Sequence, residues 1–182
     1  MRTFFTPPGR QPNGAAWQPL YERPYVTPDG GAIYHPPRWR ESRAGREMTV
    51  ARLLVDHGYD VVLLPPSRTL DVKTPDAVVI PSVGEGSEFW EFKRLTEGAT
   101  NAQEYAQRSV REGKKQAGTI VLFLSEDVTA LGGLNAINRG VLNALRYDVQ
   151  GKIERVVVLE RTGAMQILSR GELENGQRFS EL

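Results

Sequence analysis

Asp76, Glu91 and Lys93 stand at positions that suit the hydrolysis of phosphodiesters. Residues 88–93 are predicted to form a strand, in which side chains alternate between two faces, so Glu91 and Lys93 point the same way. Asp76 opens the preceding predicted strand, directly after Pro75. Antiparallel pairing of these two strands would bring Asp76 close to Glu91 and Lys93. Two neighbouring carboxylates repel each other, and a divalent cation is the usual way in which proteins offset that repulsion.

These side chains predict a metal-dependent hydrolase acting on ester bonds. Asp76 and Glu91 would hold the cation, which polarises a phosphoryl oxygen and lowers the pKa of bound water. Lys93 would orient that water or offset the charge that grows on the phosphate, and Glu47 would reach the metal or its waters from a predicted helix. The chain has no cysteine and two histidines. Thiolate sites are therefore excluded and a histidine-bound zinc is disfavoured, so the expected metal is Mg²⁺ or Mn²⁺.

Basic residues near these positions are candidates for binding the substrate, although a net charge of +1 excludes a generally basic protein. One basic group, which includes Arg46, lies before and within the first predicted helix. A second group comprises Lys93, Arg94, Arg108, Arg111, Lys114 and Lys115. A solvated helix face balanced by acids explains any single member equally well. Gln116 begins a strand beside the predicted site, so it is expected to touch substrate or Lys93, and a capping or turn role fits it equally well. The candidate substrate-binding residues are Arg46, Lys115 and Gln116.

The apolar pattern from Ser42 onward predicts an α/β (α+β) domain that positions these side chains. Helices are predicted at 46–57, 101–115 and 134–145. Strands are predicted at 60–64, 76–80, 88–93, 119–124, 155–160 and 165–168. Gly58 is expected to end the first helix in a left-handed conformation. The order α-β-β-β-α-β-α-β predicts a mixed central sheet flanked by helices in a single domain.

Residues 1–41 differ in composition from residues 42–182. They contain eight of the twelve prolines, and proline fixes φ and removes an amide donor, so this stretch is expected to be extended or irregular. They also carry several aromatic residues, which a purely flexible linker would lack. The sequence therefore predicts an arm or linker at 1–41 that packs on the following domain or on a partner, and a catalytic domain at 42–182.

Glu47, Pro75-Asp76 and Glu91-Phe92-Lys93 resemble, in order and spacing, the motif of the PD-(D/E)xK nuclease superfamily, whose core is α-β-β-β-α-β as in restriction endonucleases. Residues 46–124 are similar, more narrowly, to the C-terminal tRNA nuclease domain of CdiA-type contact-dependent growth inhibition toxins. The similar segments include Arg46-Glu47, His57-Gly58-Tyr59-Asp60-Val61 and Lys114-Lys115-Gln116-Ala117. The resemblance implies a tRNA-cleaving toxin domain that a larger carrier delivers into the target-cell cytoplasm and that a cognate immunity protein neutralises.

Two other functions stay open at this point. A DNA endonuclease of the restriction, repair or phage type would use the same catalytic group. A non-catalytic structural part of a phage or secretion system would not require the three side chains to converge. No apolar stretch approaches the roughly 18 residues of a membrane span. The first residues also lack the long apolar centre of a signal peptide, so no membrane segment is expected.

Overall fold

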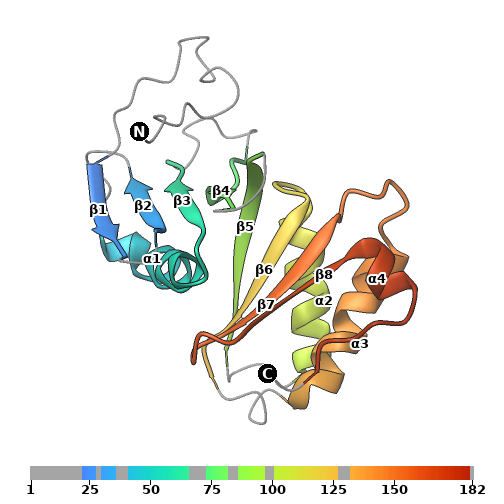
Figure 1. The fold of residues 1–182 in the computed structure, drawn as a ribbon. Helices are drawn as coiled ribbons and strands as arrows, with labels where there is room; N and C mark the ends of the chain where they lie inside the picture. Colours follow the sequence, from blue (N-terminus) through green and yellow to red (C-terminus); the bar gives the residue numbers. More distant parts are fainter. Residues whose placement is uncertain are drawn as a thin grey trace. The chain divides into compact units, whose positions relative to one another are not determined.

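The computed structural model describes residues 22–27, 30–35, 41–65, 73–81, 86–96, 101–126 and 132–180. The chain forms two compact units, whose helices and strands are labelled in Figure 1. Unit 1 comprises Met1–Pro65 and Ala77–Glu88, and unit 2 comprises Pro66–Asp76 and Phe89–Leu182. Asp76, Glu91, Lys93, Lys115 and Gln116 all belong to unit 2.

Unit 1 contains strands β1 (Glu22–Val26), β2 (Ala32–His35), β3 (Asp60–Leu63) and β4 (Ala77–Ile80), and helix α1 (Glu41–Asp56). β2 runs parallel to β3, whereas β1–β2 and β3–β4 are antiparallel pairs. The Asp60 carboxylate accepts a hydrogen bond from the Ala32 N–H at 2.7 Å, which ties β2 to the start of β3. Gly58 has a φ of 85° and its N–H donates to the Val55 carbonyl, so α1 ends as the sequence predicts.

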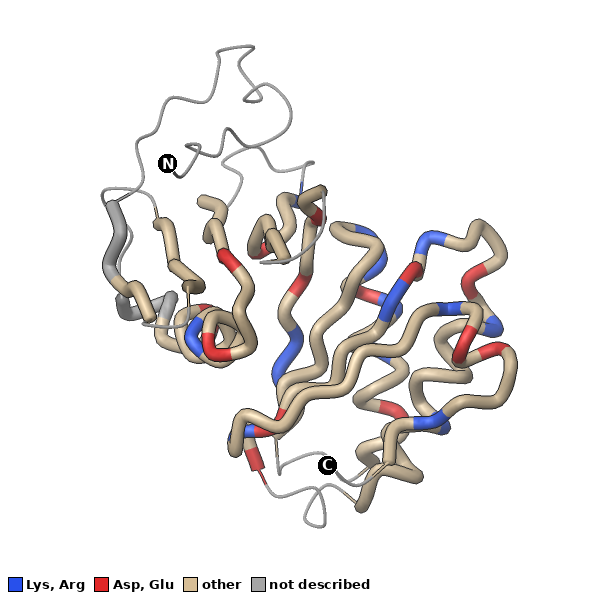
Figure 2. The backbone as a smooth tube through the Cα atoms, viewed as in Figure 1, with Lys and Arg blue, Asp and Glu red and all other residues tan. Residues whose placement is uncertain are grey.

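Unit 2 contains most of β5 (Glu88–Leu95) and the elements α2 (Ala102–Gly113), β6 (Thr119–Leu124), α3 (Gly133–Arg146), β7 (Arg155–Glu160), β8 (Met165–Ser169) and α4 (Arg170–Glu174). β5, β6 and β7 run parallel, and a helix connects each strand to the next, as parallel neighbours require. β8 follows a tight turn and pairs antiparallel with β7. Figure 2 shows charged positions on β5 and none on β6, whose six residues are all buried.

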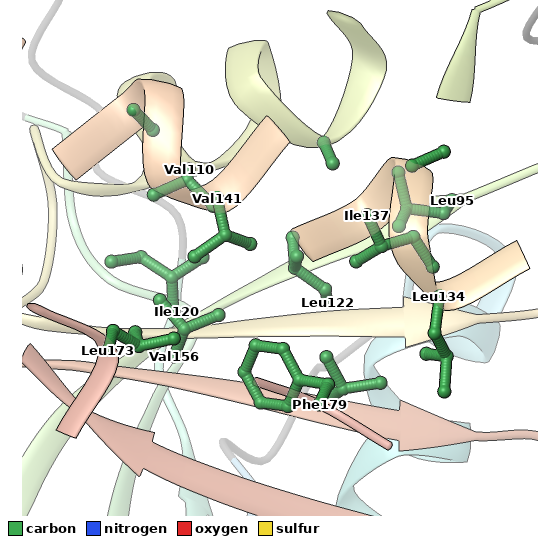
Figure 3. Close-up of a cluster of buried hydrophobic side chains, with 14 of the residues drawn as sticks. Leu95, Val110, Ile120, Leu122, Leu134, Ile137, Val141, Val156, Leu173 and Phe179 are labelled. Atoms are coloured by element: carbon green, nitrogen blue, oxygen red, sulfur yellow. The ribbon is translucent and has the colours of Figure 1, made fainter. Parts of the chain in front are cut away.

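The core of unit 2 lies between α2, α3 and the strands β6 and β7 (Figure 3). Ile120 and Leu122 of β6 and Val156 of β7 meet apolar side chains of both helices there. The helices approach so closely that a Cβ at Gly140 of α3 would lie 2.3 Å from the Gln103 carbonyl oxygen of α2. Only a residue without a side chain permits this crossing.

A buried carboxylate, Asp148, ties the loop after α3 to three other segments of unit 2. It is 1% exposed, and its oxygens accept hydrogen bonds from Lys114 Nζ at 3.1 Å, Arg170 Nη1 at 2.8 Å and the Ile153 N–H at 2.7 Å. Burial alone would raise the pKa of Asp148, but the bonds from Ile153 and Lys114 outweigh burial and hold that pKa below its ordinary value. Asp148 therefore joins the end of α2 and α4 through ion pairs, and the segment before β7 through a backbone hydrogen bond.

The segment after α4 returns to the core of unit 2. Phe179 is 3% exposed and belongs to the apolar cluster that Figure 3 shows. The side chain of buried Asn138 on α3 accepts a hydrogen bond from the Phe179 N–H at 3.0 Å and donates one to its carbonyl at 2.8 Å. These two bonds satisfy both backbone groups of a residue that would otherwise be buried without partners.

The structure confirms the predicted fold class, a mixed α/β arrangement of strands and flanking helices. The predicted order of elements corresponds to α1 through β8, whereas β1, β2 and the short helix α4 were not predicted. The described part of residues 1–41 includes β1 and β2, and β2 pairs with β3. The division into an arm at 1–41 and a domain at 42–182 stays a prediction. No helix in the described ranges is long and apolar enough to cross a membrane.

Candidate active site

The side chains of Glu91 and Lys93 lie side by side on β5, as the alternation of a strand predicts. Lys93 Nζ donates a hydrogen bond to Glu91 Oε1, so the two form an ion pair. The Glu91 side chain is 3% exposed and that of Lys93 is 24% exposed. A charged pair is thus held within a strand whose neighbour β6 is buried along its whole length.

Asp76 joins this pair from the segment that precedes β4. One of its carboxylate oxygens, Oδ2, accepts a hydrogen bond from the Phe92 N–H, at 2.7 Å. Phe92 lies between Glu91 and Lys93, so the Asp76 carboxylate is fixed beside both. The convergence of Asp76, Glu91 and Lys93 that the sequence predicts is therefore present in unit 2.

Gln116 completes the surroundings of Glu91. It lies in the turn between α2 and β6, where its N–H donates to the Gly113 carbonyl at 2.9 Å. Its side-chain Nε2 donates to Glu91 Oε1, the oxygen that also accepts from Lys93. The sequence predicted contact with substrate or with Lys93, and the contact in the structure is with Glu91. Gln116 is thus a positioning residue for this carboxylate.

Gly113 is a further positioning residue, which the sequence analysis did not single out. A Cβ at this position would lie 2.9 Å from Ile120 Cγ1 and 3.5 Å from Glu91 Cγ. The missing side chain lets the last turn of α2 pack directly on β6 and on the stem of Glu91. A glycine at the end of a predicted helix was the available signal, although it is equally typical of an ordinary helix terminus.

The electrostatic state of the two carboxylates is unusual. Burial, followed by the charge of Asp76, raises the pKa of Glu91 to about 7, although Lys93 opposes the change. Burial also raises the pKa of Asp76 above its ordinary value, against the hydrogen bond from Phe92 and the charge of Lys93. In the described part of the chain, no donor reaches the buried Glu91 Oε2. With both carboxylates ionised, the site would hold more negative charge than its own donors compensate.

This shortage of positive charge fits a divalent cation. Two carboxylates with an uncompensated buried oxygen are the kind of ligands that Mg²⁺ and Mn²⁺ take, together with waters and substrate phosphate. No group of three or more acidic or histidine side chains that could enclose a metal occurs among the described residues. Asp76 and Glu91 would therefore be the ligands from this part of the protein.

The sequence also predicts site roles for Glu47, Arg46 and Lys115. Glu47 lies on α1 in unit 1 and is partly buried, and its support of the metal stays a prediction. The side chain of Arg46 lies outside the described residues. Lys115 is exposed just after α2 and forms an ion pair with Glu112 at 2.8 Å. Its contact with substrate stays a prediction.

Comparison with solved structures gives a structural likeness, whereas the sequence comparisons give none. No known family matches the chain, and no curated protein matches it. The fold is similar to that of a chain in a CdiA-CT/CdiI toxin and immunity complex from Burkholderia pseudomallei. The sequence identity is 21%, the match covers 77% of this chain and 99% of the other, and the TM-score is 0.44.

Proposed function

We propose that the chain is a metal-dependent nuclease that hydrolyses phosphodiester bonds at Asp76, Glu91 and Lys93. The observation that carries this proposal is the convergence of two carboxylates and a lysine, with Glu91 Oε2 buried and unsatisfied within the described residues. Burying this charge is costly, and a strand with only a structural role would use apolar side chains instead. Strongly perturbed carboxylates in such a setting are typical of catalytic sites.

Each side chain has a distinct role in the proposed reaction. Asp76 and Glu91 would hold the cation through their carboxylate oxygens. A bound Mg²⁺ or Mn²⁺ would polarise the phosphoryl group and lower the pKa of water at the site. Lys93 would donate to a phosphate oxygen, where negative charge grows as water attacks phosphorus and the bond to the leaving oxygen breaks. Gln116 and the Phe92 N–H would keep the two carboxylates oriented.

The proposed substrate is tRNA, and the proposed role is that of a toxin domain in competition between bacteria. The sequence resemblance of residues 46–124 to tRNA nuclease toxins supports both. On this proposal a larger carrier delivers the domain into the target cell, and an immunity protein neutralises it in the producer. Hydrolysis of DNA would use the same three side chains, so DNA cleavage is the alternative that the experiment must separate.

The test is to incubate the purified chain with total tRNA and, separately, with plasmid DNA in Mg²⁺, Mn²⁺ or EDTA. Variants Asp76→Asn and Glu91→Gln each remove a proposed metal ligand. Lys93→Met removes the positive charge of the lysine side chain. Each loss should reduce cleavage by about 100-fold or more. Lys152→Met, an exposed lysine elsewhere in unit 2, is the matched control and should cleave normally.

The possible outcomes lead to different conclusions. Metal-dependent cutting of tRNA that the three variants lose supports the proposal. Cutting of DNA alone would keep the site and change the substrate. Cleavage that persists in EDTA, or that the variants retain while remaining folded by circular dichroism, would overturn the assigned chemistry.

A further inference from the structure

Three basic residues form a stripe along the exposed face of α2. Arg108, Arg111 and Lys115 are spaced by three and four positions, so they lie on one side of the helix and of the turn that follows it. All three are exposed, whereas Ala106 and Val110 on the opposite side are buried. We call Arg108, Arg111 and Lys115 the α2 stripe.

Within the described ranges, no ion pair is formed by the two arginines of the α2 stripe. Among the described residues, their contacts are with aromatic rings: Arg108 lies 5.1 Å from the centre of the Tyr105 ring, and Arg111 lies 5.5 Å from that of Tyr147. Lys114, between them and Lys115, behaves differently because it pairs with buried Asp148. The four members of the second basic group at positions 108–115 thus divide into a structural lysine, Lys114, and the outward-facing α2 stripe.

Tyr147 gives this surface an exposed aromatic ring. It directly follows α3 and is 65% exposed, and its carbonyl accepts a hydrogen bond from Lys114 Nζ at 3.4 Å, which fixes it beside the end of α2. Val149, two residues further, is 93% exposed. A tyrosine ring this open, next to an arginine, is the kind of surface on which an unpaired base stacks.

The α2 stripe ends at the candidate active site. Lys115 is followed by Gln116, which donates to Glu91. Lys115 pairs with Glu112, and the pKa of Glu112 lies below its ordinary value. The first cause is the hydrogen bond from Lys115, and the nearby charges of Lys73 and Lys93 contribute to a smaller extent. Lys115, at the end of the α2 stripe, and Lys93, in the candidate active site, therefore both lower the pKa of Glu112.

We propose that the α2 stripe binds the sugar–phosphate backbone of a single-stranded RNA segment, that Tyr147 stacks on one of its bases, and that the strand is thereby led to Asp76 and Glu91. The stripe supplies cations for phosphates, and the ring requires a base that is not paired. The direction of the strand rests on the nuclease function proposed above. Binding to the stripe does not depend on cleavage.

Binding is measured by fluorescence anisotropy in EDTA, with a labelled oligouridine strand and a duplex RNA of equal length. The variant Arg108→Gln/Arg111→Gln should weaken binding of the single strand about tenfold and reduce the slope of log K against log salt by about 1.4, or about 0.7 for each lost phosphate contact. Lys152→Gln/Arg161→Gln removes the same charge from other exposed positions of unit 2 and should change affinity less than about twofold.

The tyrosine is tested with a second pair of variants. Tyr147→Leu should weaken binding of the single strand about fivefold or more and leave duplex binding unchanged, whereas Tyr147→Phe should bind normally. Equal losses in the stripe and control double variants, or equal losses of single strand and duplex on Tyr147→Leu, would overturn the proposal.

Failure of this proposal can be distinguished from failure of the nuclease assignment. A protein that binds through the α2 stripe and cleaves nothing would refute only the nuclease. A protein that cleaves RNA while the stripe variants bind normally would refute only the stripe.

Discussion

Replacing Glu91 by glutamine tests whether the candidate site stores unfavourable charge in the metal-free protein. Glutamine has the shape of protonated glutamate: its oxygen can still accept from Lys93 and Gln116, and its Nε2 can donate toward Asp76. The wild-type pKa is about 7, against an ordinary value of 4.5. At about 1.4 kcal/mol for each pH unit, this difference amounts to about 3 kcal/mol of unfolding free energy.

The sign of the pH dependence follows from which state binds more protons. Between pH 4.5 and about 7 the folded protein holds a proton on Glu91 that the unfolded chain has released. The contribution of Glu91 to stability therefore falls as pH rises through this range. The Gln variant lacks this titration, so it should lie within about 1 kcal/mol of the wild type at pH 5 and be more stable by up to about 3 kcal/mol at pH 8.

The assay is urea unfolding followed by circular dichroism at pH 5 to 8 in EDTA. The quantity of interest is the change in unfolding free energy from pH 5 to pH 8 in the wild type minus the same change in Glu91→Gln, because titrating groups that do not interact with Glu91 cancel in this difference. A value near zero, or a wild type that gains stability relative to the variant with rising pH, would refute the reasoning. Adding Mg²⁺ at pH 8 should stabilise the wild type and leave the variant unchanged.

Four further substitutions are checked by urea unfolding, three of them in unit 2 and one, Gly45→Ala, in unit 1. Asp148→Asn removes the charge that two cations surround and should cost about 2–4 kcal/mol at pH 7. Because the Asp148 pKa is lowered, this cost should disappear as pH falls below about 4. Gly140→Ala places a methyl group against Gln103 and should cost about 1–3 kcal/mol, whereas Gly45→Ala in α1 meets nothing and should gain about 0.4–1 kcal/mol. Asn138→Ala leaves two buried backbone groups without partners and should cost about 2 kcal/mol or more, with faster proteolysis of the C-terminal segment. A cost below about 0.5 kcal/mol for Asp148→Asn, Gly140→Ala or Asn138→Ala would contradict the assigned contacts.

The part of the site that could be predicted from the sequence is the part that local geometry determines. Two residues separated by one position in a strand must share a face, so the pairing of Glu91 with Lys93 follows from recognising β5. The position of Asp76 follows from one further assumption about the adjacent strand. Gln116 could be placed near the site but not on Glu91, because its side chain can reach several partners from the same turn.

Other features depend on contacts between distant segments, and local pattern does not reveal those contacts. The proline-rich stretch reads as extended, yet its pairing as β2 depends on β3 and on the bond from Ala32 to Asp60. Asp148 looks like any acidic loop residue until α2 and α4 bring cations to it. The short helix α4, by contrast, had a recognisable signal, because Ser169 and Glu172 form a capping box.

The burial of Phe179 has a consequence for the order of events during synthesis on the ribosome. A nascent chain that has emerged only as far as α4 has made every helix and strand of unit 2, yet its core still lacks the Phe179 ring and Asn138 has no backbone to bind. Domains generally fold as units while the chain emerges at about 5–20 residues per second. Unit 2, and the candidate catalytic centre within it, would therefore reach full stability only after residue 179 has left the ribosome, so incomplete products of this chain should be unstable and inactive.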